Sequence, residues 1–265
     1  MKIAVENLNV KYGEKEIIKN INFQVNSGEV LSIIGPNGSG KSTIIKALSR
    51  CLKISGGSIY IDGKSVDKIN TKDLAKNLAV LPQVKNIPYN ILVEELVSYG
   101  RFPHLKFGKR LGQEDREIIS WALERTGLSE LRKRFVLTLS GGERQRAWIA
   151  MSLAQKPKIL ILDEPTTYLD ISYQLEVLEL VKELNNTLGI TVIMVLHDLN
   201  QAARYSDRIM VINNGNLCNL DSPEKILNKD MLREIFRIDA DIYTDKTNKC
   251  PYFIPKSNVF PKVEL

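Results

Sequence analysis

The stretch that decides the fold is residues 35–43, which read Gly35-Pro36-Asn37-Gly38-Ser39-Gly40-Lys41-Ser42-Thr43. It matches the phosphate-loop pattern G-x-x-x-x-G-K-[ST] in full. The apolar run 30–34 before it predicts a buried strand, and residues 42–52 after it predict a helix. In a strand–loop–helix unit of this kind, the glycines let backbone N–H groups face phosphate oxygens, and the helix N-terminus adds its positive end. The sequence therefore predicts a nucleoside triphosphate site at this loop.

Two side chains of the loop have predicted roles of their own. Lys41 should reach the β- and γ-phosphates, and the Ser42 hydroxyl should ligate Mg²⁺. The alternative is a glycine turn that only links a strand to a helix. The position of the motif between the predicted strand and the predicted helix favours the phosphate site.

A second pattern lies at residues 159–165, which read Ile159-Leu160-Ile161-Leu162-Asp163-Glu164-Pro165. The continuous apolar run is typical of a strand that is covered on both faces. Asp163 at its tip can hold Mg²⁺, usually through water. Glu164 can orient and deprotonate the attacking water as a general base. The alternative is a pair of carboxylates that ends a strand in solvent, but the preceding phosphate loop favours the catalytic interpretation.

A third motif lies at residues 139–145, which read Leu139-Ser140-Gly141-Gly142-Glu143-Arg144-Gln145. Serine and two glycines at the start of a predicted helix combine a hydroxyl, bare backbone amides and a helix dipole, which together make an anion site. One chain has no need of two γ-phosphate sites for one nucleotide. The motif is therefore predicted to complete the nucleotide pocket of a second copy, whereas a helix C-cap or a hinge is the alternative.

The rest of the chain predicts an α/β fold, a P-loop NTPase core with a mostly parallel sheet and an antiparallel β part at the N-terminus. Residues 2–10 alternate apolar and polar, as in a half-exposed strand, and a second strand should end at Val25. The helical pattern of residues 84–157 predicts a helical subdomain inserted into a domain of residues 1–236, followed by a tail of residues 237–265. Further strands are predicted at 58–61, 78–81, 191–196, 208–212 and 216–220, and helices at 93–100, 114–126, 143–155, 172–188, from about 198, and from Ser222-Pro223.

Composition excludes some classes of protein and leaves others open. The 265 residues carry 37 Lys and Arg against 31 Asp and Glu, a net charge of +6 that no clustered basic stripe accompanies, so nucleic acid is not an expected partner. The first ten residues lack the apolar core of a signal peptide. The longest apolar runs, 159–162 and 192–196, are too short to span a bilayer. The three cysteines have no metal-ligand or redox spacing and are expected to be reduced thiols.

In this order along the chain, the three motifs resemble those of the ATP-binding-cassette ATPases. The resemblance covers about residues 1–225 and identifies the segment 139–145 as the family's signature. It implies that two subunits sandwich two ATP molecules head to tail. It also implies that Tyr12 stacks on adenine, and that Gln83 contacts Mg²⁺ and the attacking water and relays the nucleotide state to a permease. Finally, it implies that Asp170 belongs to the loop that communicates across the dimer and that His197 contacts the γ-phosphate.

Three segments are similar to importer ATPases for ferric siderophores, haem and cobalamin: 97–104, with the pattern G-R-[YF]-P-H, 169–177 and 196–205. This resemblance implies a peripheral ATPase on the cytoplasmic face of the cell membrane, served by a polytopic permease and a substrate-binding protein. Iron–siderophore complexes are the expected cargo. Haem or cobalamin import is the alternative, and a soluble non-transport ATPase such as an iron–sulfur assembly factor is the alternative of a different class. The cargo touches the permease and the binding protein, so no residue of this chain identifies it.

Basic residues gather within and just after the pattern G-R-[YF]-P-H. His104 lies in a loop with Arg101, Lys106, Lys109 and Arg110, and this cluster predicts a solvated face, with contact to a lipid surface as the alternative. The signature also carries Glu143 where the family often has glutamine, a departure that is not expected to impair function.

Overall fold

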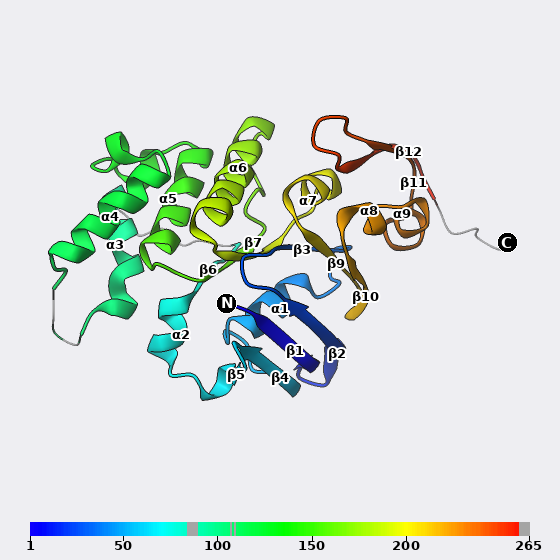
Figure 1. Cartoon of the computed structure of the whole chain (residues 1–265), viewed down its shortest axis with the longest axis horizontal. Coiled ribbons are helices and arrows are strands. Elements are labelled where there is room, and N and C mark those ends of the chain that lie inside the picture. Colours follow the sequence, from blue (N-terminus) through cyan, green and yellow to red (C-terminus); the bar gives the residue numbers. More distant parts are fainter. Residues whose placement is uncertain (84–89, 107, 109, 260–265) are drawn as a thin grey trace. The chain divides into compact units, whose positions relative to one another are not determined.

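The computed structural model describes residues 1–83, 90–106, 108 and 110–259. Contacts divide the chain into two units. The first unit contains Met1–Ile3, Asn26–Gly28 and Tyr60–Ile193, and the second contains the remaining segments, Ala4–Val25, Glu29–Ile59 and Met194–Leu265. Figure 1 labels the helices and strands of both units.

Most of an N-terminal β layer belongs to the second unit. Strands β1 (Ile3–Tyr12), β2 (Lys15–Val25) and β4 (Gly56–Ile61) lie in the order β2-β1-β4. Only two residues join β1 to β2, a connection that neighbouring strands can make only when they are antiparallel. Buried and more exposed residues largely alternate along β1, as the pattern of residues 2–10 predicts, and β2 ends at Val25, also as predicted.

The second unit also contains the strands around the phosphate loop. β3 (Val30–Ile34) is buried throughout and runs parallel to β9 (Arg208–Asn213), and β10 (Asn216–Asp221) pairs antiparallel with β9. β8 (Thr191–Val195), whose last two residues belong to this unit, follows β3 in the order β10-β9-β3-β8. Helix α1 (Lys41–Leu48) comes directly after the loop. The predicted sequence of strand, loop and helix is therefore confirmed.

In the first unit the strand order is β8-β7-β6. β6 (Leu78–Leu81) and β7 (Ile159–Asp163) are parallel, with Leu78 opposite Ile159 and Leu81 opposite Leu162. This pairing confirms a mostly parallel core. β5 (Lys64–Ser65) pairs antiparallel with the end of β4 and is followed by α2 (Thr71–Asn77).

The described residues from 90 to 156 form helices and the loops between them. Their β pairing is limited to one isolated bridge, between Leu92 and Phe135. Helix α5 (Gly141–Ala154) is buried on several sides, as its apolar composition predicts. It packs against α3 (Val93–Ser98), α4 (Gln113–Arg125) and α6 (Ile171–Leu188). Residues 84–89, with which the predicted insertion begins, lie outside the described residues. Between residues 90 and 156 the helices are α3, α4 and α5, with short 3₁₀ segments at Tyr99–His104, Ser129–Leu131 and Val136–Thr138.

Beyond residue 222 the chain is more regular than its sequence pattern suggests. Pro223 opens α8 (Pro223–Ile226) after Ser222 at the N-cap position, as predicted. Helix α9 (Lys229–Phe236) and an antiparallel hairpin of β11 (Ile238–Thr244) and β12 (Pro251–Asn258) follow.

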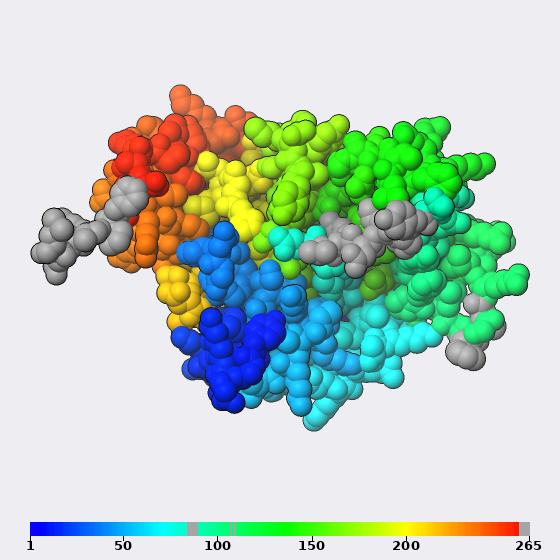
Figure 2. Space-filling model, turned by 180° about the vertical axis from the view of Figure 1, so that it is seen from behind, coloured from blue at the N-terminus to red at the C-terminus, as the bar shows by residue number. Residues whose placement is uncertain are grey.

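The hairpin is fixed to helix α7 (Leu199–Tyr205) by two hydrogen bonds between one side chain and one residue of backbone. Asn200 accepts from the Phe253 N–H at 2.9 Å and donates to the Phe253 carbonyl at 3.2 Å. Figure 2 shows this C-terminal region at the surface, in red and orange. Nothing in the described part of the chain forms a helix long and apolar enough to cross a membrane.

The prediction of a solvated basic loop is wrong for Arg101. Its side chain is only 5% exposed, and it donates from Nε to Asp115 at 2.9 Å and from Nη1 to the Ala154 carbonyl at 2.7 Å. His104 Nε2 lies 2.8 Å from the Gln155 carbonyl. The segment caps the C-terminal end of α5 because that helix end has carbonyls that its own backbone leaves unpaired. Lys106 and Arg110 are exposed as predicted, and Lys109 lies outside the described residues.

Replacing Arg101 by methionine should lower the free energy of unfolding by about 3 kcal/mol, because the change leaves Asp115 as an uncompensated, largely buried carboxylate. Burial alone would raise the pKa of Asp115, but hydrogen bonds from the Gly112 N–H and from Arg101 outweigh it and lower that pKa. The stability contributed by this carboxylate is therefore present above the ordinary Asp pKa and is lost as the pH falls through the lowered value.

Urea unfolding at neutral pH and in acid measures this effect. Lys106→Met is the matched control, since Lys106 is exposed and the change should cost less than about 0.5 kcal/mol. Equal stability of the two variants at neutral pH would contradict the account of Arg101.

Candidate functional site

The phosphate loop of the second unit has a backbone that only glycine can follow at two positions. Gly35 has a φ of 152° and Gly40 a φ of 108°, both in the region that side chains disfavour. A Cβ at Gly35 would lie 2.0 Å from the Ile212 carbonyl oxygen, and one at Gly40 would lie 2.6 Å from Ile18 Cδ1. The loop is therefore curled and closely packed, as a phosphate cradle requires.

Two polar side chains of this loop fit a bound phosphate. The buried Lys41 Nζ donates to the carbonyls of Gly35 at 2.8 Å and of Pro36 at 2.9 Å, so that it lies folded over the loop. The buried Ser39 hydroxyl has no hydrogen-bond partner among the residues that the structure describes. A buried hydroxyl without a partner is costly, and an anion in the loop would supply an acceptor.

His197 and the phosphate loop lie at the same edge of the second unit's sheet. The Leu196 N–H donates to the Ile33 carbonyl at 3.2 Å, which brings the ends of β8 and β3 together. His197 is the next residue and is exposed. Its exposure excludes the alternative of a histidine buried in the core. Tyr12 is the last residue of β1 and is 47% exposed.

In the first unit, the structure brings Gln83 and Glu164 together. Leu81 pairs with Leu162, and Gln83 and Glu164 each lie two positions beyond these paired residues, so both are at the carboxyl edge of β6 and β7. The Gln83 amide donates to Glu164 Oε2, and the Thr167 hydroxyl donates to the same oxygen at 3.1 Å. Glu164 is half-buried and is thus held in one orientation by two side chains. Thr167 was not predicted from the sequence.

The predicted Mg²⁺ ligands Asp163, in the first unit, and Ser42, in the second, both carry oxygen atoms of the kind that Mg²⁺ prefers. Asp163 is the last residue of β7, and the residue is only 6% exposed. Ser42 is the second residue of α1, as its predicted role requires.

The signature lies at a helix N-terminus, which excludes the C-cap alternative. Ser140 is the N-cap of α5, and its hydroxyl accepts from the Glu143 N–H at 3.3 Å. The Glu143 carboxylate accepts in return from the Ser140 N–H at 2.8 Å, and this hydrogen bond lowers the pKa of Glu143. The pair forms a capping box. Glutamate at residue 143 is therefore well suited to the start of α5. That this departure from the family pattern leaves function intact stays a prediction.

The loop that carries Asp170 displays large apolar side chains to solvent. Asp170 is the N-cap residue of α6, next to Ile171, which is 76% exposed. Tyr168 is 96% exposed and has a φ of 64°, a left-handed conformation that is unusual for an aromatic residue. Sequence reasoning missed both apolar residues, although a tyrosine and an isoleucine beside a predicted loop aspartate were a usable signal. Such exposure indicates a surface that another molecule covers.

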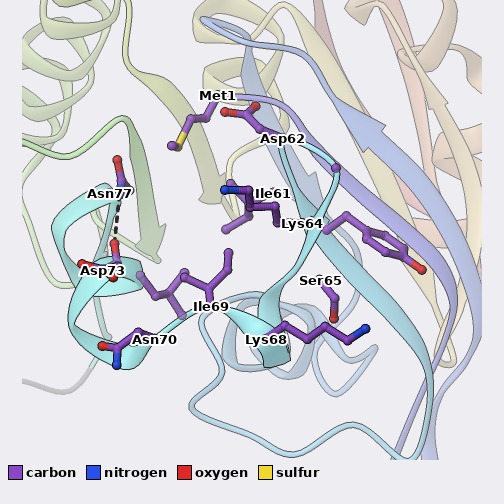
Figure 3. A pocket seen from close by; sticks show the side chains of 13 residues that line it. Met1, Ile61, Asp62, Lys64, Ser65, Lys68, Ile69, Asn70, Asp73 and Asn77 are labelled. Atoms are coloured by element: carbon purple, nitrogen blue, oxygen red, sulfur yellow. Dashed lines mark hydrogen bonds between the residues drawn. The ribbon is translucent and has the colours of Figure 1, made fainter.

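A hollow of about 750 Å³ lies between the β4–β5 turn and α2, in the first unit. Figure 3 shows Ile61 and Ile69 in it, with Asp73 and Asn77 on α2, where the Asn77 amide donates to the Asp73 carbonyl. None of the predicted site residues lines this hollow, and it is therefore separate from the nucleotide chemistry.

Comparison with known proteins agrees with these local features. A family model described as ABC transporter matches residues 18–167. The iron(3+)-hydroxamate import ATP-binding protein FhuC of Bacillus subtilis is 47% identical, over 93% of this chain and 92% of its own length. The petrobactin import ATP-binding protein FpuC of Bacillus anthracis is 49% identical, over 96% and 93%. The dimeric ATP-binding cassette MJ0796, solved in a post-hydrolysis state with ADP and Pi, superposes with a TM-score of 0.71 at 30% identity, over 83% of this chain and 98% of that one.

Proposed function

This chain belongs to the ABC transporter family, and from that premise we propose that it is the ATP-hydrolysing subunit that powers import of iron–siderophore complexes through a separate membrane permease. The observation that carries the proposal is the Glu164 carboxylate, which Gln83 and Thr167 hold at the carboxyl edge of β6 and β7. A carboxylate held in this way is poised to act as a general base.

The phosphates of ATP bind the loop 35–43, where Lys41 leaves the loop carbonyls for the β- and γ-phosphates and Ser39 gains an acceptor. Adenine stacks on the ring of the exposed Tyr12. His197 donates to the γ-phosphate. Ser42, Asp163 and Gln83 would hold Mg²⁺, which would supply positive charge that offsets the charge of the phosphates.

Glu164 orients a water molecule for in-line attack and takes its proton as the new oxygen–phosphorus bond forms. The bond to the β-phosphate oxygen breaks, and the products are ADP and inorganic phosphate. Gln83 and Thr167 both donate to the same oxygen of Glu164, Oε2, and so hold the carboxylate in one orientation while it accepts the proton.

The working unit contains two copies of the chain, arranged head to tail. Each chain has one phosphate loop and one signature, so Ser140, Gly141 and Gly142 of one copy close over the γ-phosphate bound by the other. Asp170 and the exposed Tyr168 beside it meet the second copy. The dimeric state of the MJ0796 cassette with ADP and Pi supports this arrangement.

The subunit works at the cytoplasmic face of the membrane, bound to a polytopic permease that receives cargo from a substrate-binding protein. Support for iron–siderophore cargo comes from the names of two relatives, one an importer of iron(3+)-hydroxamate and the other of petrobactin. Haem or cobalamin is the alternative cargo. A soluble iron–sulfur assembly factor is the alternative of a different class, and these two relatives do not support it.

Uptake of iron-labelled siderophores by the parent cells tests the cargo. Cells that carry a Lys41→Ala allele should lose uptake of at least one siderophore class and keep uptake of haem and cobalamin. Wild-type siderophore uptake by the mutant, in cells without a second importer of that class, would contradict the iron assignment. Loss of haem or cobalamin uptake in its place would identify the alternative cargo.

A further inference from the structure

Gly142 stands in a helix that does not need a glycine for its backbone. It is the second residue of α5, and its φ lies outside the positive region that would favour glycine. Alanine is a much better helix former than glycine at such a position. The absence of a side chain at residue 142 therefore calls for a reason in its surroundings.

The reason within the subunit is the ring of Tyr173, in the first turn of α6. A Cβ added to Gly142 would lie 2.3 Å from Tyr173 Cδ1 and 2.7 Å from its Cγ. These atoms form the base of the ring, which cannot swing away without a change of the whole side chain. The neighbouring glycine is different, because a Cβ at Gly141 would lie 3.2 Å from Leu169 Cδ2, the flexible end of a leucine.

Two hydrogen bonds of Gln174 hold the start of α6, and they limit the freedom of the ring to withdraw. The Gln174 N–H donates to the Asp170 carbonyl at 3.0 Å, and the Gln174 amide donates to the Leu169 carbonyl at 2.9 Å. One turn further along, Arg146 of α5 forms an ion pair with Glu176 of α6. An ion pair thus joins helices α5 and α6 close to the contact between Tyr173 and Gly142.

We infer that Tyr173 is a positioning residue that joins the signature to the loop of Asp170 within one subunit, and that residue 142 is glycine because this ring lies on it. The inference rests on the proposed function, in which Ser140 and Gly142 close over the nucleotide of the second copy. The ring sets how far the start of α5 stands from the start of α6, and the two segments consequently approach the second copy as one rigid piece.

A double-mutant cycle on thermal unfolding tests the contact without any need for activity. Gly142→Ala should lower the melting temperature by about 5 °C or more, through overpacking. In a Tyr173→Ala background the same alanine should have no cost or should stabilise, because the ring is gone. Tyr173→Phe keeps the ring and is the matched control, in which Gly142→Ala should cost as much as in wild type. Equal costs of Gly142→Ala in all three backgrounds would overturn the inference.

ATP-driven pairing of the full chain tests the positioning role. With Glu164→Gln present to block hydrolysis, Gly142→Ala should weaken pairing by about tenfold or more, and the further change Tyr173→Ala should restore most of that loss. Pairing that stays lost when Tyr173 is alanine would mean that the second copy's nucleotide requires the glycine, and the inference would be wrong. Absence of ATP-driven pairing in Glu164→Gln alone would count against the proposed two-copy function, whereas the unfolding cycle would still decide the contact.

Discussion

A Lys41→Ala chain is expected to hydrolyse ATP about 100- to 1,000-fold more slowly than wild type, the usual loss when a charged donor to the transition state is removed. Lys41 is buried in the phosphate loop, where its ammonium group donates to the carbonyls of Gly35 and Pro36. Alanine removes the positive charge that faces the β- and γ-phosphates, and no other side chain of the loop carries one.

Phosphate release by the purified full chain at saturating ATP and Mg²⁺ measures this loss. Lys46→Ala is the matched control, because Lys46 lies on the same helix α1 and is exposed. The control should keep hydrolysis within about twofold of wild type, since exposed charges contribute little. Comparable rates for Lys41→Ala and Lys46→Ala would contradict the assignment of the loop.

Glu164→Gln should reduce hydrolysis by about 100- to 10,000-fold and leave ATP binding intact, because the amide keeps the shape of the side chain and cannot accept a proton from water. ATP that is bound and not hydrolysed should hold two copies together. In light scattering, the 30.0 kDa chain should double its mass with ATP and Mg²⁺ and remain single with ADP.

The exposed Glu179 on α6 provides the control. Glu179→Gln removes the same charge and should hydrolyse ATP at the wild-type rate. If the Glu164→Gln chain released phosphate as fast as this control, Glu164 would not be the general base.

The strands and motifs that were predicted from the sequence depend on local patterns. The buried strands β3 and β7 are continuous apolar runs, and the residues that follow them belong to motifs with fixed spacing. The meeting of Gln83 with Glu164 follows from the parallel register of two such strands. The sequence alone implied a role for Gln83 only through family resemblance, because no local pattern links two residues that are 81 positions apart.

The parts that the sequence did not predict depend on distant partners. Arg101 lies among basic residues in the sequence, but its buried side chain donates hydrogen bonds to Asp115 and to the carbonyl of Ala154, which is 53 residues away. Strand β12 contains Pro251 and Pro255, and proline ordinarily argues against a strand because it has no N–H to donate. Both prolines are tolerated here because each strand of a two-stranded hairpin has one edge that needs no N–H donors. The ring of Tyr173 on Gly142 joins two helices and leaves no trace in either helix's periodicity.

Mixing two inactive variants of the chain tests most directly whether two copies share each nucleotide site. Lys41→Ala disables the phosphate loop of one chain, and Ser140→Arg blocks the signature of the other. In a mixed pair, one of the two sites therefore combines an intact phosphate loop with an intact signature. The account predicts that each variant alone is inactive and that an equal mixture regains hydrolysis, with about a quarter of the wild-type number of intact sites. A mixture that releases phosphate no faster than either variant alone would contradict it.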